Sequence, residues 1–357
     1  MITKLVYVLT CSPEAMYIEQ ALMSVWSARH WNPDAHIVLI EDDKTDALLT
    51  GNRAEILNYI SEKIVVPFED DSLPPMYRSR WIKTRVRQLI QGDFLFVDCD
   101  TICQRALDEV DTFNCEIGAV LESHLLVSDY CDGLYRKAKQ VTATIGVDLD
   151  DEQRYFSSGV LLVRDTKKAH ELYEKWHQYW KEGLSMGLKI DQPALAKANR
   201  GMGHIIQQIP DTYNCILFTH PPFVQEAHIL HIAAYHNPSF LFFDKVLSYV
   251  RQEGLTEWIK RNIVHPCDTM LPFDYTIKHS SIKQRVMWIC SFASTASTLA
   301  VNIPSLLDEF FGKSSPKVIL RLIHMRCYGV AAVCWMGWKR IYVLRKKGQK
   351  GNLCRKQ

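Results

Sequence analysis

The sequence lacks any C-x-x-C pair among its 11 cysteines, and no uninterrupted apolar run approaches the roughly 18 residues of a membrane-spanning helix. The odd, scattered cysteines argue against a disulfide framework and for reduced thiols. The apolar run at residues 5–9 is too short for the core of a signal peptide, and Glu14 follows soon after it. We therefore expect a cytoplasmic protein whose first apolar run is a buried strand.

Acidic residues are missing from the end of the chain. Residues 310–357 contain twelve Lys or Arg and no Asp or Glu, which leaves a charge of about −10 on residues 1–309. The sequence also lacks internal repeats, and its 47% apolar and 23% charged residues are typical of a globular protein. This distribution indicates an acidic catalytic body and a basic region that attaches by charge.

Short apolar runs alternate with helical periodicity in the first two thirds of the chain. We predict strands at 5–9, 37–40, 64–66, 94–97, 118–121, 159–163 and 228–232, and helices at 16–28, 54–60, 78–91 and 167–182. This alternation predicts an α/β fold with a mostly parallel sheet flanked by helices, in which ligands collect at the carboxyl ends of the strands. Residues 1–245 are the predicted catalytic domain and 246–357 a helical, basic C-terminal region, with the boundary between 245 and 280.

Two acidic residues, Asp98 and Asp100, follow the apolar strand at 94–97. If the strand continues through them, both side chains project to the same side of the sheet. Paired carboxylates of this kind suit Mn²⁺ or Mg²⁺, which neutralises the charge on a nucleotide diphosphate leaving group. The alternative is a pair of solvated turn aspartates.

Three cations precede this pair. Arg80, Lys83 and Arg87 are spaced by three and four residues and would share one face of the predicted helix. A cation from this face, Lys83 first and Arg80 second, is expected to bind the donor phosphates. A solvated basic face is the alternative for at least one of the three.

The order of these features resembles that of GT-A-fold glycosyltransferases, over roughly residues 3–240. The nearest likeness is to family-8-type retaining enzymes, the group that contains glycogenin and bacterial lipopolysaccharide galactosyl- and glucosyltransferases. The features that carry the resemblance are Leu9-Thr10, Tyr17, Arg80, Lys83, residues 95–100, residues 155–160, Asp191-Gln192 and His231.

The resemblance implies roles for individual residues. Asp98, Asp100 and His231 would hold Mn²⁺ or Mg²⁺, and a UDP-sugar would be the donor. The residues implied in binding the donor are Leu9, Thr10, Cys11, Tyr17, Arg80, Lys83, Asp98, Cys99, Ser157, Ser158, Gly159 and Asn237. His231 has a structural alternative, because a lone histidine in an apolar strand is often a hydrogen-bonded core residue.

The sequence departs from the family at two places. Ser157 stands where the family has Asn before Ser-Gly, which shortens one contact to the donor sugar. Asn237 and Ser239 replace the Lys and Trp of the family's Lys-Pro-Trp signature, so an expected phosphate-binding cation is missing. Lys83, Arg80 or His236 are the candidates to replace it.

Asp191 and Gln192 are the candidate catalytic pair that the resemblance places at the sugar ring. A glutamine cannot act as a general base, which favours a retaining reaction, with Asp129, Asp132 and Asp191 left as alternative bases. Asp191 also fits a simple helix N-cap. The segment 123–153 is expected to select the acceptor.

The basic region 317–357 combines Trp335, Trp338 and Tyr342 with Lys and Arg, which suits the headgroups of an anionic membrane. Packing on the catalytic domain or on a partner is the alternative, and no nucleic-acid recognition module accompanies the charge. We expect a saccharide or lipid-linked acceptor in cell-surface polysaccharide or lipopolysaccharide synthesis, and a cytoplasmic or peripheral membrane location.

Two other functions remain open. A sugar nucleotidyltransferase normally has a Gly-rich basic loop after its first strand, whereas residues 10–14 contain neither Gly nor a cation. A non-catalytic scaffold on a transferase-like fold would explain the missing Lys at Asn237.

Overall fold

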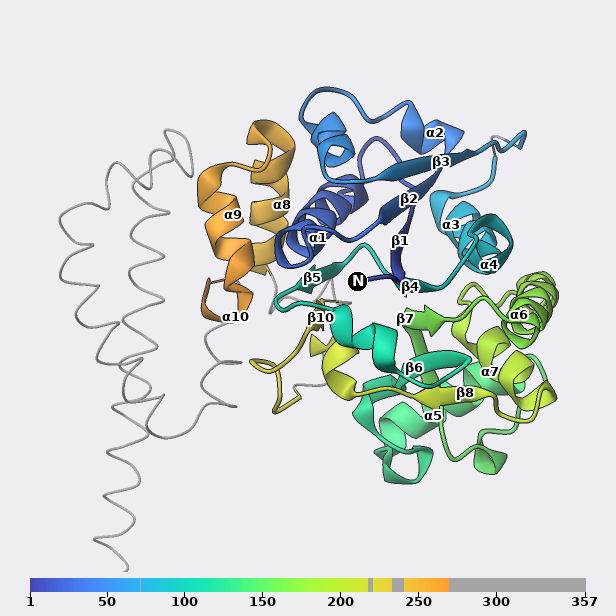
Figure 1. Cartoon of the computed structure of the whole chain (residues 1–357). Coiled ribbons are helices and arrows are strands. Elements are labelled where there is room, and N and C mark those ends of the chain that lie inside the picture. Colours follow the sequence, from blue (N-terminus) through green and yellow to red (C-terminus); the bar gives the residue numbers. More distant parts are fainter. Residues whose placement is uncertain (71, 218–220, 233–240, 270–357) are drawn as a thin grey trace, which may run out of the picture. The chain divides into compact units, whose positions relative to one another are not determined.

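The computed structural model describes residues 1–70, 72–217, 221–232 and 241–269 (Figure 1). A seven-stranded sheet in the order β3-β2-β1-β4-β7-β6-β8 forms its centre. Its strands are β1 (Lys4–Leu9), β2 (Ile37–Asp42), β3 (Glu62–Val66), β4 (Phe94–Val97), β6 (Ile117–Leu121), β7 (Phe156–Val163) and β8 (Ile206–Gln208). Only β7 runs antiparallel to its neighbours, β4 and β6, so the predicted mostly parallel sheet is confirmed.

Alternate residues of the central strands enter two different cores. In β1, Leu5, Tyr7 and Leu9 pack in one core, and Val6 and Val8 pack in the other. Both sets are buried because helices cover both faces of the sheet, as expected for a largely parallel sheet.

The first core is covered by helices from both ends of the described chain: α1 (Tyr17–Trp31), the 3₁₀ helix η1 (Gly51–Asn58), α8 (Leu241–Glu253), α9 (Glu257–Val264) and α10 (Pro266–Thr269). The other core is covered by α3 (Pro75–Lys83), α4 (Val86–Leu89), α6 (Lys167–Ser185) and α7 (Gln192–Gly201). The short helix α2 (Asp43–Asp46) follows β2, and α5 (Asp132–Ala143) lies in the segment 123–153. Figure 1 shows α8 beside α1.

Two helix predictions were wrong in detail. The single helix expected at 78–91 is divided into α3 and α4, because Arg85 leaves the helical conformation at φ −120° and ψ 8°. The Thr84 hydroxyl donates to the Arg80 carbonyl at 2.8 Å and holds the end of α3. The helix expected at 54–60 is the 3₁₀ helix η1, which begins at Gly51.

A second, three-stranded sheet lies in the order β5-β10-β9, with β5 (Thr101–Cys103), β9 (Cys215–Ile216) and β10 (Ile229–His231). His231 pairs with Thr101 of β5, which follows directly on Asp100. This pairing brings the late histidine beside the acidic pair, although about 130 residues separate them in the chain.

Helices α8 and α9 belong to the same core as β1, through residues such as Leu247 and Ile259. The described residues therefore extend this domain into the interval 245–280, where the sequence places the boundary. Residues 270–357, including the predicted membrane-binding segment 317–357, lie outside the described residues. Among the described residues, no helix has both the length and the apolar character needed to cross a membrane.

Candidate active site

The acidic pair lies in a turn. β4 ends at Val97, and the chain turns through Asp98–Asp100 before β5 begins at Thr101. The Asp98 amide donates to the Gly159 carbonyl at 2.8 Å, and the Thr101 hydroxyl donates to the Asp98 carbonyl at 2.8 Å. The premise that the strand continues through the pair was wrong. The turn, held by β7 and β5, is what brings the two carboxylates to one side.

His231 completes a group of three metal-ligating side chains. One ligand atom from each of Asp98, Asp100 and His231 lies within 4.8 Å of the others. Ligands on opposite sides of a small divalent ion are about 4.2 Å apart, so this group needs little adjustment to hold one. Two carboxylates and an imidazole also match the ligand preferences of Mn²⁺.

Hydrogen bonds orient the His231 ring. Nδ1 lies 2.8 Å from the side-chain oxygen of Asn214, which is fully buried, and Nε2 lies 3.2 Å from Asp100. An Nδ1–H that donates to Asn214 leaves Nε2 as the ligand atom, the arrangement typical of metal-binding histidines. Sequence reasoning missed Asn214, and no local pattern marks it.

The electrostatics of the acidic pair are unequal. Burial raises the pKa of Asp98 above its ordinary value, although Lys83 opposes the shift. Burial acts in the same direction on Asp100, but the His231 ring outweighs it and lowers the pKa of that carboxyl. The same contact outweighs burial at His231 and raises its pKa. Asp100 and His231 thus form the ion pair of the group.

Gly159 makes room for this group. A Cβ at position 159 would lie 2.3 Å from His231 Cε1 and 3.2 Å from Asp98 Oδ2. The first distance is far below van der Waals contact, so any side chain here would displace the ring. The close approach of the His231 ring therefore explains why a glycine stands at position 159.

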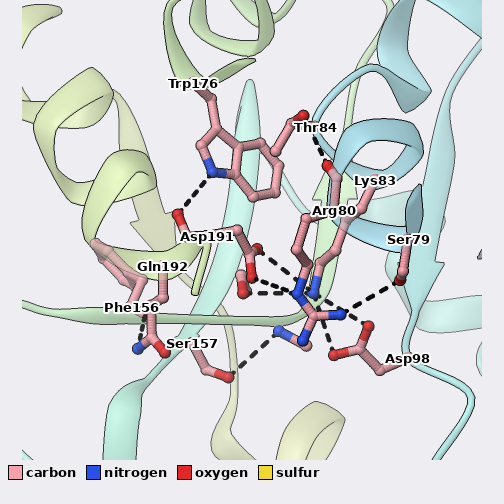
Figure 2. A network of polar contacts seen from close by, with 12 residues as sticks. Ser79, Arg80, Lys83, Thr84, Asp98, Phe156, Ser157, Trp176, Asp191 and Gln192 are labelled. Atoms are coloured by element: carbon pink, nitrogen blue, oxygen red, sulfur yellow. Dashed lines mark hydrogen bonds and ion pairs between the residues drawn. The ribbon is translucent and has the colours of Figure 1, made fainter. Parts of the chain in front are cut away.

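Two cations of α3 extend the site (Figure 2). Lys83 Nζ lies 3.1 Å from Asp98 and 3.7 Å from Asp191, and Arg80 Nε lies 3.1 Å from Asp191. Lys83 is buried, and its ammonium group also lies 3.4 Å from the Ser158 hydroxyl. Burial acts to raise the pKa of Asp191, but Lys83 and Arg80 outweigh it and lower that pKa.

Arg87 does not join them. It follows the break between α3 and α4, and its guanidinium donates to the Gly92 carbonyl and lies 3.3 Å from Asp165. Arg87 is buried, so it is neither a donor ligand nor the solvated cation considered as the alternative. The prediction that the three cations share one face was wrong, because it assumed an unbroken helix.

Asp191 precedes α7 without capping it, since its side chain makes no capping hydrogen bond. Trp176 of α6 donates its indole N–H to the Asp191 carbonyl at 2.9 Å. Gln192 donates to the Phe156 carbonyl at 2.9 Å and to Glu122 at 3.0 Å. The Gln192 side chain is therefore held by Phe156 and Glu122, and Figure 2 shows the Asp191 side chain beside Arg80 and Lys83.

Glu122 is a site residue that sequence reasoning missed. Burial is the main cause that raises the pKa of its carboxyl, and Gln192 is its hydrogen-bond donor. The next two residues, Ser123 and His124, have φ values of 60° and 59°, a conformation that costs energy in residues other than glycine. A signal was present, because Glu122 directly follows the predicted strand at 118–121.

The predicted base-binding residues lie at the carboxyl end of β1. The Thr10 hydroxyl donates to the Pro75 carbonyl at 2.6 Å, and the Cys11 amide donates to the Thr45 hydroxyl at 2.8 Å. Leu9 is buried in the core, whereas Tyr17, at the start of α1, is 45% exposed.

Of the remaining residues predicted to bind the donor, some have defined contacts and one lies outside the described residues. Cys99 is buried, with its thiol donating to the Val8 carbonyl at 3.3 Å. The Ser157 hydroxyl accepts from the Gly159 amide at 3.3 Å. Asn237 and the neighbouring His236 lie outside the described residues.

Solved structures similar to this chain are glycosyltransferases. The galactosyltransferase LgtC, in complex with donor and acceptor sugar analogues, has 14% identity and a TM-score of 0.45, over 66% of this chain and 88% of that chain. The bifunctional enzyme WbbM has 14% identity and a TM-score of 0.47, over 72% of this chain and 50% of that chain. The glycosyltransferase GlyE of Streptococcus pneumoniae TIGR4 has 17% identity and a TM-score of 0.44, over 76% of this chain and 66% of that chain.

No protein-family model and no curated protein matches this chain. Identities and TM-scores of this size do not by themselves assign an activity.

Proposed function

We propose that this chain is a metal-dependent glycosyltransferase of the GT-A type that takes a sugar from a nucleotide-diphosphate donor, with UDP-hexose as the expected donor. One observation carries the proposal: Asp98, Asp100 and His231 converge at the carboxyl edge of the sheet, directly beside Lys83 and Arg80. Carboxylates that attract a divalent cation and cations that attract phosphate are combined wherever proteins bind a metal–diphosphate complex.

Asp98, Asp100 and His231 would hold the cation. When bound, a divalent ion supplies Lewis-acid stabilisation to the diphosphate that leaves the sugar. Lys83 lies 3.1 Å from Asp98, close enough for its ammonium group to bind a phosphate oxygen beside the carboxylate. This assignment supports Lys83 as the replacement for the cation missing at Asn237.

Asp191 and Gln192 would face the sugar. The Asp191 carboxylate is kept ionised by Lys83 and Arg80 and can accept hydrogen bonds from sugar hydroxyls. Gln192 is neutral and is held by Phe156 and Glu122, so it can orient a group at the reaction face without removing a proton. This arrangement supports retention of anomeric configuration.

Glu122 is the carboxyl group that would meet the acceptor. It shares a hydrogen bond with Gln192, and it directly precedes the segment 123–153 that the sequence assigns to acceptor choice. A saccharide or lipid-linked acceptor in surface polysaccharide synthesis, and attachment of 317–357 to an anionic membrane, remain part of the proposal.

The test is a screen of UDP-sugars with the full-length protein in Mn²⁺, with release of UDP as the readout. Slow donor hydrolysis requires no acceptor, so the screen does not depend on knowing it. We expect activity that is abolished by excess EDTA and restored by Mn²⁺. Where the sugar is transferred to an acceptor, NMR of the glycoside should show the donor's anomeric configuration.

The site variant Asp100→Asn should lose this activity, and its matched control is Asp111→Asn. Asp111 accepts hydrogen bonds from the Ile2 and Thr3 amides at the opposite edge of the sheet, and its loss should leave activity intact. Calorimetry with UDP and Mn²⁺ separates an enzyme from a scaffold. Undiminished activity in EDTA, or no metal-dependent binding of any nucleotide, would reject the proposal.

A further inference from the structure

A buried carboxylate and two arginines lie next to residues 12–16, the segment that leads from the end of β1 to α1. Glu19, in the first turn of α1, is 1% exposed and binds two guanidinium groups at once. Arg53 Nε of η1 lies 2.8 Å from Glu19 Oε1, and Arg251 Nε of α8 lies 2.9 Å from the same oxygen. These three residues come from three helices that are distant in the sequence.

The arginines also bind the backbone of the segment itself. Arg53 donates to the carbonyls of Pro13 and Ala15, at 3.3 and 3.0 Å. Arg251 donates to the carbonyl of Glu14 at 3.2 Å and also to that of Ala15. Three consecutive carbonyls thus accept from two guanidinium groups.

Charge explains why the segment is held so closely. One carboxylate neutralises only one of the two guanidinium groups, so the second needs other acceptors. The carbonyl dipoles of residues 13–15 supply them, and Arg has the planar fork that can reach several acceptors together. These hydrogen bonds therefore favour this conformation of the segment.

The far end of α8 is tied to η1 as well. Asn52 donates to the Gln252 carbonyl at 2.6 Å, and the Leu255 amide donates to Glu55 at 2.9 Å. Gly254 ends α8 at φ +74°, and a Cβ there would lie 2.8 Å from Glu55 Oε2. These contacts fix Arg251 at the end of its helix.

The segment leads into the candidate donor site. Thr10 and Cys11 precede it, and Tyr17 follows it at the start of α1. A shift of residues 12–16 would therefore move both flanks of the predicted base-binding surface.

We propose that Glu19, Arg53 and Arg251 are positioning residues that hold the segment 12–16 in the conformation that binds the nucleotide base. Helix α8, which follows β10 and His231 in the chain, would thus contribute to donor affinity without touching the donor. This inference rests on the proposed function for its donor part, and on the contacts of Glu19, Arg53 and Arg251 for its structural part.

The experiment uses the full chain with Arg251→Gln, Arg251→Lys and Arg164→Gln. Arg164 is the matched control, because it too binds one carboxylate, Asp93, and two carbonyls, but at the opposite edge of the sheet. Amide hydrogen exchange of residues 11–18 is measured without ligand. The Michaelis constant and the turnover number for the donor are then measured, together with the affinity for UDP and Mn²⁺.

We expect exchange in residues 11–18 to become at least about tenfold faster in Arg251→Gln, because the variant loses the charged hydrogen bonds to Glu19 and to the carbonyls of Glu14 and Ala15. The Michaelis constant should rise by roughly the same factor with an unchanged turnover number, because the loss affects binding of substrate and transition state alike. Arg251→Lys keeps the charge and should show a smaller effect of the same kind. Arg164→Gln should change neither quantity.

Unchanged exchange in both Arg251 variants overturns the positioning role, and so does an equal effect in Arg164→Gln. If Arg251→Gln does not fold, Arg251→Lys decides. If exchange increases but the affinity for UDP does not fall, the segment does not form the base site and the proposal fails. A wild-type protein that binds no nucleotide refutes the proposed function and this donor role together, while exchange still decides the structural part.

Discussion

The parallel strands of the central sheet begin at one side, the amino edge, and finish at the other, the carboxyl edge. Both sides carry charged residues, but they combine them differently. At the amino edge, Arg164 lies 3.1 Å from Asp93 and donates to the carbonyls of Val110 and Phe113 at 2.8 and 2.7 Å. Asp111 there accepts from two backbone amides. Each charge meets a group of opposite polarity, so the arrangement stabilises the fold.

At the carboxyl edge, like charges are placed side by side. Asp98, Asp100 and Asp191 lie within one cluster, with Lys83 and Arg80 between them. Asp191 Oδ2 is buried and has no hydrogen-bond partner among the described residues. Such clusters cost folding free energy and persist where a ligand needs them. The charged groups that stabilise the fold thus lie where the parallel strands begin, and the candidate site lies where they end.

The largest expected effect is that of Asp100→Asn. Loss of this carboxylate should lower donor turnover about a thousandfold or more, since a bound metal is worth several kcal/mol to the leaving group. The melting temperature should change little, because the variant relieves the like-charge contact with Asp98 but loses the ion pair with His231. Activity assays test the loss of turnover, and thermal unfolding tests the melting temperature. A strong loss of stability would show that Asp100 stabilises the fold as the residues of the amino edge do.

The next effect is that of Gly159→Ala. The added Cβ would meet His231 Cε1 at 2.3 Å and move the ring, so affinity for Mn²⁺ should fall about 10- to 100-fold. Calorimetric titration with the metal alone measures this. Gly133→Ala in α5 is the control, because its Cβ would meet nothing within 4 Å. Equal metal affinity in both variants would contradict the claim that Gly159 is needed to make room for the His231 ring.

Arg164→Gln tests the amino edge. We expect it to lower the free energy of unfolding by about 2–3 kcal/mol, since a part-buried charge loses an ion pair and two carbonyls. The kinetic constants should not change. Urea denaturation measures the loss, and Arg200→Gln, which breaks the exposed pair with Asp151, should cost much less. A lowered turnover number in Arg164→Gln would show that the two edges are coupled.

The last effect depends on pH and concerns Glu41 at the carboxyl end of β2. Its side chain is fully buried, with Lys63 Nζ 3.8 Å away and Asp46 and Asp42 nearby. Burial, followed by Asp46, raises the pKa of Glu41 to about 8 from 4.5 in the unfolded chain. The folded state therefore keeps a proton that the unfolded state loses, and stability falls as the pH rises from 4.5 towards 8.

Replacement by Gln removes this dependence. The difference in unfolding free energy between Glu41→Gln and wild type should grow in favour of the variant by up to ~1.4 kcal/mol per pH unit in that range. Denaturation at pH 5 and pH 8 measures it. A variant that is less stable than wild type at pH 8 would show that Glu41 is ionised and paired instead.

Much of the fold could be predicted because the apolar runs of this sequence are short and well separated. The runs at 5–9 and 94–97 became β1 and β4, with boundaries shifted by at most one residue. The division of the helix at 78–91 could not be predicted, because no Pro or Gly marks Arg85. The Thr84 hydroxyl lies 2.8 Å from His177 of α6, and this contact depends on tertiary packing.

The candidate site was predictable where its signal is local. Asp98 and Asp100 follow a buried strand, and Gly159 follows two serines at the start of another. Glu122 was overlooked although it stands at a strand end. Asn214 and the cluster of Glu19, Arg53 and Arg251 have no local pattern, since each residue is an ordinary polar residue until its partners are known.

The sequence by itself determined the alternation of strands and helices, because the burial of an apolar run depends mainly on its own composition. It also determined which polar residues end the strands. Only the tertiary structure decided which of these residues meet: the pairing of β10 with β5 placed His231 beside Asp100, and the end of α3 placed Lys83 there while Arg87 turned away. Contacts of this kind depend on strand register and helix ends, which are set by packing between segments far apart in the chain.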